Sequence, residues 1–196
     1  MLLEVGRTAL EPGNITKGDI LQAFPFQNTF DLVTLPGSTL RKVFERSVAD
    51  LSQRGPHDSG EFLQVSGFKL IYDLRLSPGS RLVEAQVQSS DKGYERLKDG
   101  QEYHVVMSDY ISRGGDGYKM IKEEKLNQRQ GFLDFDQILT YLKLFSPVSP
   151  RIQGRIVMKG EIPEEPASTN DANGNRVLSE TLIQICFVIS NIFLLS

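Results

Sequence analysis

The sequence predicts an α+β fold, in which layered, mostly antiparallel sheets are flanked by helices. Residues 68–74 and 83–87 alternate apolar and polar side chains, and a Ser-Pro-Gly-Ser turn separates the two stretches. A period of two is typical of paired strands. Residues 38–51 instead carry apolar side chains at helical spacing. Because the two periods occur in separate segments, we expect helices packed against antiparallel sheets.

The first part of the chain is predicted to form a short helix, a strand and a long helix. Thr16 and Asp19 make a helix-start signal for residues 16–24, and a proline ends that helix. Residues 29–35 are rich in aromatic and β-branched side chains and predict a strand. Ser38 is predicted to cap the long helix. The apolar face of the long helix consists of Leu40, Val43, Phe44, Ser47, Val48 and Leu51.

The second part of the chain is predicted to continue with a strand over residues 103–108. That strand leads into a glycine-rich segment, residues 110–118. A helix is expected over residues 134–145, followed by two prolines that prevent its continuation. A last strand is expected over residues 152–158.

The composition changes after residue 159, and this change predicts three parts. Residues 1–160 form the folded domain. Residues 161–176 are polar, contain two prolines and predict a linker. Residues 177–196 form a hydrophobic tail, in which 181–196 carry no charge.

Composition excludes several classes of function. The net charge is −3 and no block of Lys or Arg occurs, so we expect no nucleic-acid partner. The single cysteine, Cys186, rules out an internal disulfide. With one Cys and only two histidines, His57 and His104, no zinc-ligand spacing exists. A metal site made of carboxylates alone stays open, but no carboxylates cluster in the sequence to suggest one. We therefore expect this chain to bind no metal cofactor of its own.

The segment Gly114-Gly115-Asp116-Gly117 is the strongest motif in the sequence. Glycines allow the backbone to approach a ligand closely or to adopt positive φ. A carboxylate between them suits ribose hydroxyls, because it accepts hydrogen bonds from both. The alternative is a tight turn in which Asp116 caps the next helix.

Two aromatic residues, Phe26 and Tyr110, lie in loops beside the ends of predicted strands. Aromatic faces stack on nucleobases and contribute about 1–3 kcal/mol per base. Each of the two side chains could equally belong to the core.

Several blocks together resemble the C-terminal domain of 5'-nucleotidases over about residues 7–158, most closely the animal membrane-anchored ecto-5'-nucleotidases and the related apyrases. The blocks are 24–26 (Phe-Pro-Phe), 28–33 (Asn-Thr-Phe-Asp-Leu-Val), 37–40 (Gly-Ser-Thr-Leu), 60–67 (Gly-Glu-Phe-Leu-Gln-Val-Ser-Gly), 110 with 114–118 (Tyr, then Gly-Gly-Asp-Gly-Tyr) and 154–156 (Gly-Arg-Ile). Their order and spacing match the family.

The resemblance implies roles for individual residues. Phe26 and Tyr110 would sandwich a base, with Tyr in place of the family's usual Phe at 110, and Asp116 would hold the ribose. Arg7 would belong to a block that holds the phosphate end of the substrate, although the Asn of that block has no counterpart here. An adenosine- or AMP-like ligand and a homodimer are also implied.

The resemblance further implies a catalytic half outside this chain. The family holds two divalent, zinc-like metal ions in an N-terminal metallophosphoesterase domain, and we expect that domain to be absent here. The chain is then a nucleotide-recognition domain of an enzyme that hydrolyses nucleoside 5'-phosphates, and is inactive alone. The alternative is a non-catalytic nucleotide-binding or dimer-partner module.

Signals for export are mixed. Asn14 begins an Asn-Ile-Thr glycosylation sequon, although it could equally be a loop residue before a helix capped by Thr16. The tail has the order of a GPI signal, namely small residues with Asn170 as candidate attachment site, a polar spacer and an apolar end. The alternative for the tail is a helix docked on the domain or a frayed chain end. The start of the chain is no signal peptide. We expect the full-length parent at the extracellular face of the plasma membrane, held by a GPI anchor.

Overall fold

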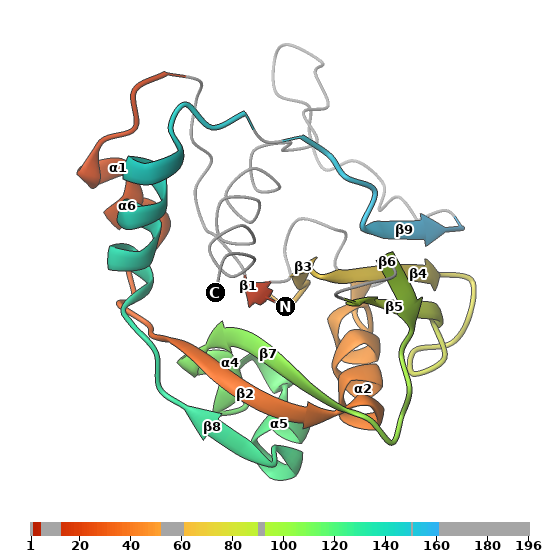
Figure 1. The fold of residues 1–196 in the computed structure, drawn as a ribbon. Coiled ribbons are helices and arrows are strands. Elements are labelled where there is room, and N and C mark those ends of the chain that lie inside the picture. Colours follow the sequence, from red (N-terminus) through yellow and green to blue (C-terminus); the bar gives the residue numbers. More distant parts are fainter. Residues whose placement is uncertain (1, 5–12, 52–60, 90–92, 150, 161–196) are drawn as a thin grey trace, which may run out of the picture.

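The computed structural model describes residues 2–4, 13–51, 61–89, 93–149 and 151–160, and contains two sheets with helices packed against them (Figure 1). The predicted α+β class is confirmed. Arg7, Asn170, the predicted linker 161–176 and the hydrophobic tail 177–196 lie outside the described residues.

The first sheet has five strands and is centred on a long antiparallel pair. Its order is β3 (Gln64–Ser66), β1 (Leu2–Glu4), β7 (Glu102–Ser108), β2 (Phe30–Pro36) and β8 (Asn127–Arg129). The register of β2 with β7 runs from Phe30 opposite Ser108 to Pro36 opposite Glu102. All of β2 is buried or half-buried. A strand covered on both faces is a continuous apolar run, which explains the composition of this segment.

The second sheet has four strands and contains the predicted hairpin. Its order is β6 (Gly93–Arg96), β5 (Leu82–Ser89), β4 (Phe68–Asp73) and β9 (Ile156–Lys159). The antiparallel pairing of β4 with β5 confirms the prediction, but Val83 is 48% exposed. A register shift between Ile71 and Tyr72 turns Val83 outward. The last strand pairs in parallel with β4 and starts at Ile156 instead of residue 152.

Helix α2 (Gly37–Ser47) buries the predicted apolar face, including Leu40, Val43 and Phe44 at 0% exposure. The expectation that Ser38 caps this helix is wrong. The N-cap is Pro36, with no side-chain cap bond, because β2 continues directly into the helix. Backbone carbonyls of Asp99 and Gln101 accept the first N–H groups at 3.0 and 2.9 Å. A Cβ on Gly37 would lie 2.1 Å from the carbonyl oxygen of Lys98, so this close approach requires glycine.

Helices α1 (Lys17–Ala23) and α6 (Asp134–Phe145) lie side by side at one end of the molecule (Figure 1). The helix signal at Thr16 is confirmed as a capping box with Asp19, and α6 has its predicted bounds. Both helices pack over a small core shared with two residues of the first sheet. That core consists of Ile20, Ala23, Phe24, Phe30, Val106, Ile138 and Tyr141.

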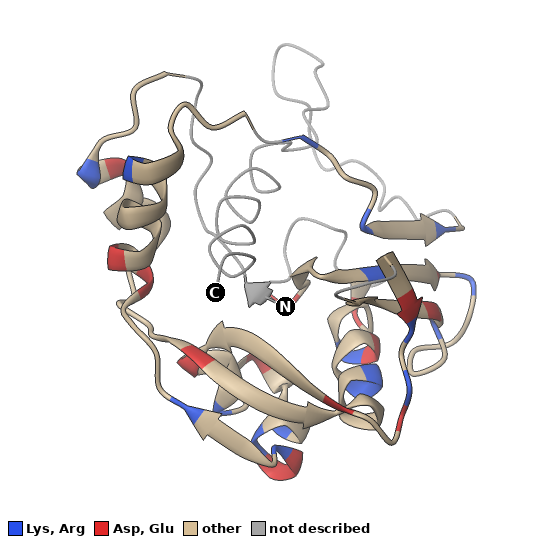
Figure 2. Cartoon of the chain, in the orientation of Figure 1, with Lys and Arg blue, Asp and Glu red and all other residues tan. Residues whose placement is uncertain are grey.

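A larger core fills the space between the two sheets and α2. Acidic and basic residues are interspersed along the described elements, and none of these elements is basic throughout (Figure 2). The charges therefore form no continuous basic stripe along the described elements.

Candidate functional site

The end of the β2–β7 pair brings together the two loops that carry the candidate aromatic residues. The backbone N–H of Asp109 donates to the carbonyl oxygen of Thr29 at 2.9 Å. In return, the N–H of Thr29 donates to Asp109 Oδ1 at 3.2 Å. Phe26 lies three residues before Thr29, and Tyr110 directly follows Asp109. The two loops are therefore fastened to each other although they are far apart in sequence.

Both aromatic side chains are solvent-exposed, Phe26 at 58% and Tyr110 at 46%. The alternative that they belong to the core is therefore wrong for this structure. Their neighbours Phe24 and Phe30 are the core residues, at 5% and 3% exposure. A positive φ of 54° at Gln27 marks the turn after Phe26. Large exposed aromatic surface is available for a flat ligand.

Tyr110 lies in α4 (Asp109–Ser112), a short helix capped by the Ser108 side chain. The chain then passes through Gly114 at φ 91° into the 3-10 turn η1 (Gly115–Gly117). Asp116 itself has φ 48°. The Tyr110 hydroxyl donates to Asp116 Oδ1 at 2.9 Å, so the structure brings these two predicted site residues together.

The alternative role of Asp116 as a helix cap is wrong. Helix α5 (Lys119–Glu124) has Tyr118 as its N-cap residue and no side-chain cap bond. The Asp116 carboxylate is directed to Tyr110 instead. A carboxylate has about four acceptor positions, so this one can still accept a ligand hydroxyl while it is bonded to Tyr110.

The glycine loop, residues 114–117, packs against a buried side chain and a cluster of salt bridges. Tyr118 is fully buried and its hydroxyl donates to the carbonyl oxygen of Glu61. Burial raises the pKa of Tyr118, so its hydroxyl stays protonated as a donor. Arg46 pairs with Asp50 at 2.8 Å and with Glu61 at 2.7 Å. A Cβ on Gly117 would meet the Arg46 guanidinium at 2.6 Å, so the loop backbone lies directly against it.

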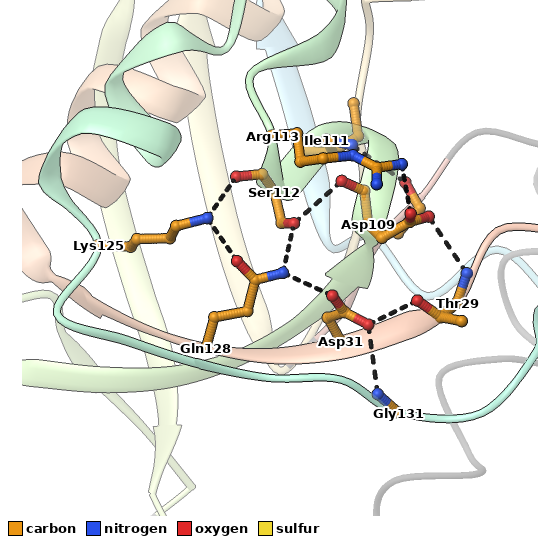
Figure 3. Close-up of polar contacts among 10 residues, drawn as sticks. Thr29, Asp31, Asp109, Ile111, Ser112, Arg113, Lys125, Gln128 and Gly131 are labelled. Atoms are coloured by element: carbon orange, nitrogen blue, oxygen red, sulfur yellow. Dashed lines mark hydrogen bonds and ion pairs between the residues drawn. The ribbon is translucent and has the colours of Figure 1, made fainter.

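A polar network behind α4 was not predicted from the sequence (Figure 3). Asp31 is 2% exposed and accepts hydrogen bonds from Thr29, Gln128 and the Gly131 N–H at 2.7, 2.6 and 3.2 Å. Gln128 also donates to Ser112 Oγ at 3.0 Å. One signal for this network was present in the sequence, because Asp31 is a carboxylate within a mostly apolar strand. A buried carboxylate requires hydrogen-bond partners.

The network also borders a polar pocket of about 300 Å³, lined by Thr29, Asp31, Asp109, Arg113, Gln128 and Gln130. Both of its carboxylates already have partners, since Asp31 has three donors and Asp109 pairs with Arg113 and Thr29. We therefore assign this network a structural role. It ties β2, β8 and α4 together, and so fixes the helix that carries Tyr110.

The predicted glycosylation sequon begins in the loop before helix α1. Asn14 is exposed in the loop before α1, and the hydroxyl of Thr16 donates to Asp19 Oδ2 at 2.7 Å. Glycosylation of Asn14 stays a prediction. Within the described parts of the chain, no three His, Cys, Asp or Glu residues are grouped to hold a metal ion. None of the described helices has the length and apolar character needed to cross a membrane.

Comparison with known proteins places this geometry in a family. Residues 2–123 match the model of the 5'-nucleotidase C-terminal domain. The chain is 40% identical over 147 residues to a 5'-nucleotidase of Homo sapiens, which covers 74% of this chain and 25% of that protein. A snake venom 5'-nucleotidase of Naja atra is 38% identical over 148 residues, covering 74% and 27%. An apyrase of Tabanus yao is 36% identical over 160 residues, covering 79% and 29%.

A solved structure agrees. The crystal structure of a 5'-nucleotidase precursor from Thermus thermophilus is 34% identical, with a TM-score of 0.70, and covers 75% of this chain and 28% of that one. The chain thus spans about a quarter of the length of the relatives that it matches. The family match covers most of the region described here, including both exposed aromatic residues and the glycine loop, and the chain belongs to the 5'-nucleotidase C-terminal domain family.

Proposed function

We propose that this chain recognises the nucleoside part of a nucleotide for a 5'-nucleotidase that hydrolyses nucleoside 5'-phosphates. One observation carries the proposal. Two exposed aromatic side chains, Phe26 and Tyr110, come from loops fastened to each other at the end of β2 and β7, and the Asp116 carboxylate lies beside one of them.

The chemistry of these three side chains suits an adenosine- or AMP-like ligand. Aromatic faces stack on a base at a gain of about 1–3 kcal/mol per base. A carboxylate accepts hydrogen bonds from vicinal sugar hydroxyls. The arrangement leaves the phosphate to residues outside the described part of the chain, among which Arg7 is our candidate. We propose that the remaining ligand contacts come from another domain of the complete enzyme. The chain alone should then bind nucleosides weakly, and the phosphate should add little even with Arg7 present.

Hydrolysis itself requires groups beyond this region. In the complete enzyme, we propose that two divalent metal ions in another domain activate a water molecule and neutralise the phosphate. The purified chain should then release no phosphate from AMP above the blank, even with added zinc. Release above the blank that disappears in Asp116→Ala would show that the chain is catalytic by itself.

Calorimetric titration with adenosine tests the proposal. The double variant Phe26→Ala with Tyr110→Ala should lose detectable binding, because both stacking faces are removed. Phe132→Ala is the matched control, since Phe132 is another exposed phenylalanine, at 74%, outside these loops. Its affinity should equal that of the wild type. If the double variant binds adenosine as well as the wild type does, the aromatic pair is not the site.

The parent enzyme, on our proposal, works outside the cell, because the relatives include a snake venom 5'-nucleotidase. A GPI anchor at the hydrophobic tail would hold it at the membrane. Fused behind a signal peptide, the chain should reach the cell surface and be released by a phosphatidylinositol-specific phospholipase. Surface display that resists the phospholipase would contradict the anchor.

A further inference from the structure

A hydrogen bond connects the side chains of Tyr110 and Asp116. The Tyr110 hydroxyl lies 2.9 Å from Asp116 Oδ1. Tyr110 is exposed and Asp116 is half-buried. A phenylalanine at position 110 would keep the aromatic ring and lose this bond.

The Tyr110 ring also packs against the backbone of the glycine loop. A Cβ on Gly115 would lie 2.4 to 2.6 Å from three ring carbons, so the ring rests directly on the backbone of the glycine loop. Asp116, the next residue, has a positive φ of 48° and projects its carboxylate back to the hydroxyl of the same ring. The ring is therefore fixed by a contact with the loop backbone and by a hydrogen bond at its tip.

We propose that the Tyr110 hydroxyl is a positioning group, which holds the base-stacking ring and the sugar-binding carboxylate as one preassembled unit that favours ribonucleosides. This inference rests on the proposed function. An ordered side chain loses less conformational freedom when a ligand binds, and preorganisation of this kind raises affinity. Each carboxylate oxygen has two acceptor positions, so the bond from Tyr110 leaves Oδ1 and Oδ2 able to accept from a sugar diol.

The unit has a specific consequence for ligand choice. Loss of the hydroxyl should weaken contacts made through the carboxylate and leave base stacking intact, because a phenylalanine ring stacks as well as a tyrosine ring. The effect should therefore be large for adenosine, which has both sugar hydroxyls, and small for the free base adenine or for 2'-deoxyadenosine.

The experiment is calorimetric titration of the full chain and its Tyr110→Phe variant with adenosine, 2'-deoxyadenosine and adenine. We expect adenosine affinity to fall about three- to tenfold, the range that one net hydrogen bond supports, while adenine affinity changes less than about twofold. Tyr94→Phe is the matched control, since Tyr94 lies in β6 and contacts Lys69. In an Asp116→Asn background, Tyr110→Phe should have a smaller effect, because the two side chains act together.

A ligand-free measurement tests the same positioning directly. Three-bond NMR couplings should show one χ1 rotamer for Asp116 in the wild type and an average over rotamers in Tyr110→Phe. Equal couplings in both proteins would overturn the inference.

The outcomes separate the two proposals. Unchanged or tighter adenosine binding by Tyr110→Phe, with a wild type that binds adenosine through Phe26, would overturn the positioning role and leave the proposed function standing. An equal loss for adenosine and adenine would assign the hydroxyl to folding of the loop and also overturn it. A wild type that does not bind adenosine would overturn both.

Discussion

Asp134 is a buried carboxyl group in the first turn of α6, with a side-chain environment that penalises its charge. It is 3% exposed, and its Oδ1 accepts the N–H of Phe135 at 2.6 Å. Burial raises the pKa of Asp134 above its ordinary value of 3.8, more than the backbone hydrogen bonds to Phe135 and Asn28 lower it. The folded protein therefore holds this proton more tightly than the unfolded chain does.

The pH dependence of stability follows from this raised pKa. The contribution of Asp134 is fully present below pH 3.8 and is lost as the pH rises through the folded-state pKa, at about 1.4 kcal/mol for each pH unit by which that pKa is raised. Asp134→Asn removes the titration and keeps an acceptor for Phe135. Its free energy of unfolding, measured by urea denaturation, should rise relative to the wild type as the pH is raised above 3.8.

Asp136→Asn is the control for this prediction, because it makes the same charge change on an exposed residue of the same helix turn. The buried Asp134 carboxyl remains in this control, so its free energy of unfolding should still fall as the pH rises above 3.8. A difference between Asp134→Asn and the wild type that stays constant, or falls, as the pH rises would contradict the assignment.

At the scale of single residues, sequence patterns indicated candidate positions but did not indicate their contacts. The glycine segment pointed to Asp116, but its bond to Tyr110 depends on two rotamers and a positive φ, which no pattern displays. The polar network around Asp31 could not be predicted for a related reason. Its partners Gln128 and Gly131 are 97 and 100 residues away, so only the folded chain shows that its charge is satisfied.

Helix α2 contains two serines whose replacement by alanine should lower stability to different extents. Ser47 is buried and its Oγ accepts the N–H of Leu63 at 2.9 Å. Ser47→Ala should lower the free energy of unfolding by about 1–3 kcal/mol, because a buried N–H loses its acceptor. Ser38 is exposed and makes no cap bond. Ser38→Ala should change stability by less than about 0.5 kcal/mol.

Chemical denaturation of both variants measures this contrast. Replacement of an N-cap side chain by alanine typically lowers the free energy of unfolding by about 1 kcal/mol. A loss of that size in Ser38→Ala would mean that the serine, and not the loop carbonyls of Asp99 and Gln101, holds the start of the helix.

At the scale of elements, long periodic segments and the short helix α1 with its capping box were predictable, and the shortest strands were not. The faces of α2 and α6 and the β4–β5 hairpin follow directly from the period of their apolar residues. Strands β6 and β8 have four and three residues, all partly or fully exposed, so they carry no apolar alternation. These strands form because the backbone N–H and C=O groups of a neighbouring strand can hydrogen-bond to them.

At the scale of the whole molecule, the described residues form two cores of unequal size. The larger one joins both sheets and α2, and the smaller one lies under α1 and α6. Elements with less buried apolar surface open at lower free energy. The α1–α6 pair should therefore exchange its amide hydrogens faster than β4 and β5 do.

Two variants test this division by hydrogen exchange. Ile138→Ala should speed exchange in α1 and α6 and leave β4 and β5 nearly unchanged, because Ile138 belongs to the smaller core. Leu40→Ala, in the larger core, should cost about 2–5 kcal/mol and speed exchange throughout. Uniform acceleration by Ile138→Ala would mean that the molecule opens as a single unit.

The pairing of β2 with β7 also determines when the candidate site can exist during synthesis. Thr29 and Asp109, which fasten the two loops, are 80 residues apart. Chains are made from the N-terminus at about 5–20 residues per second. Phe26 therefore leaves the ribosome several seconds before Tyr110 can join it. On the proposed function, capture of a nucleoside should begin only once this late segment has emerged, so nascent chains that end before Tyr110 should not bind the ligand.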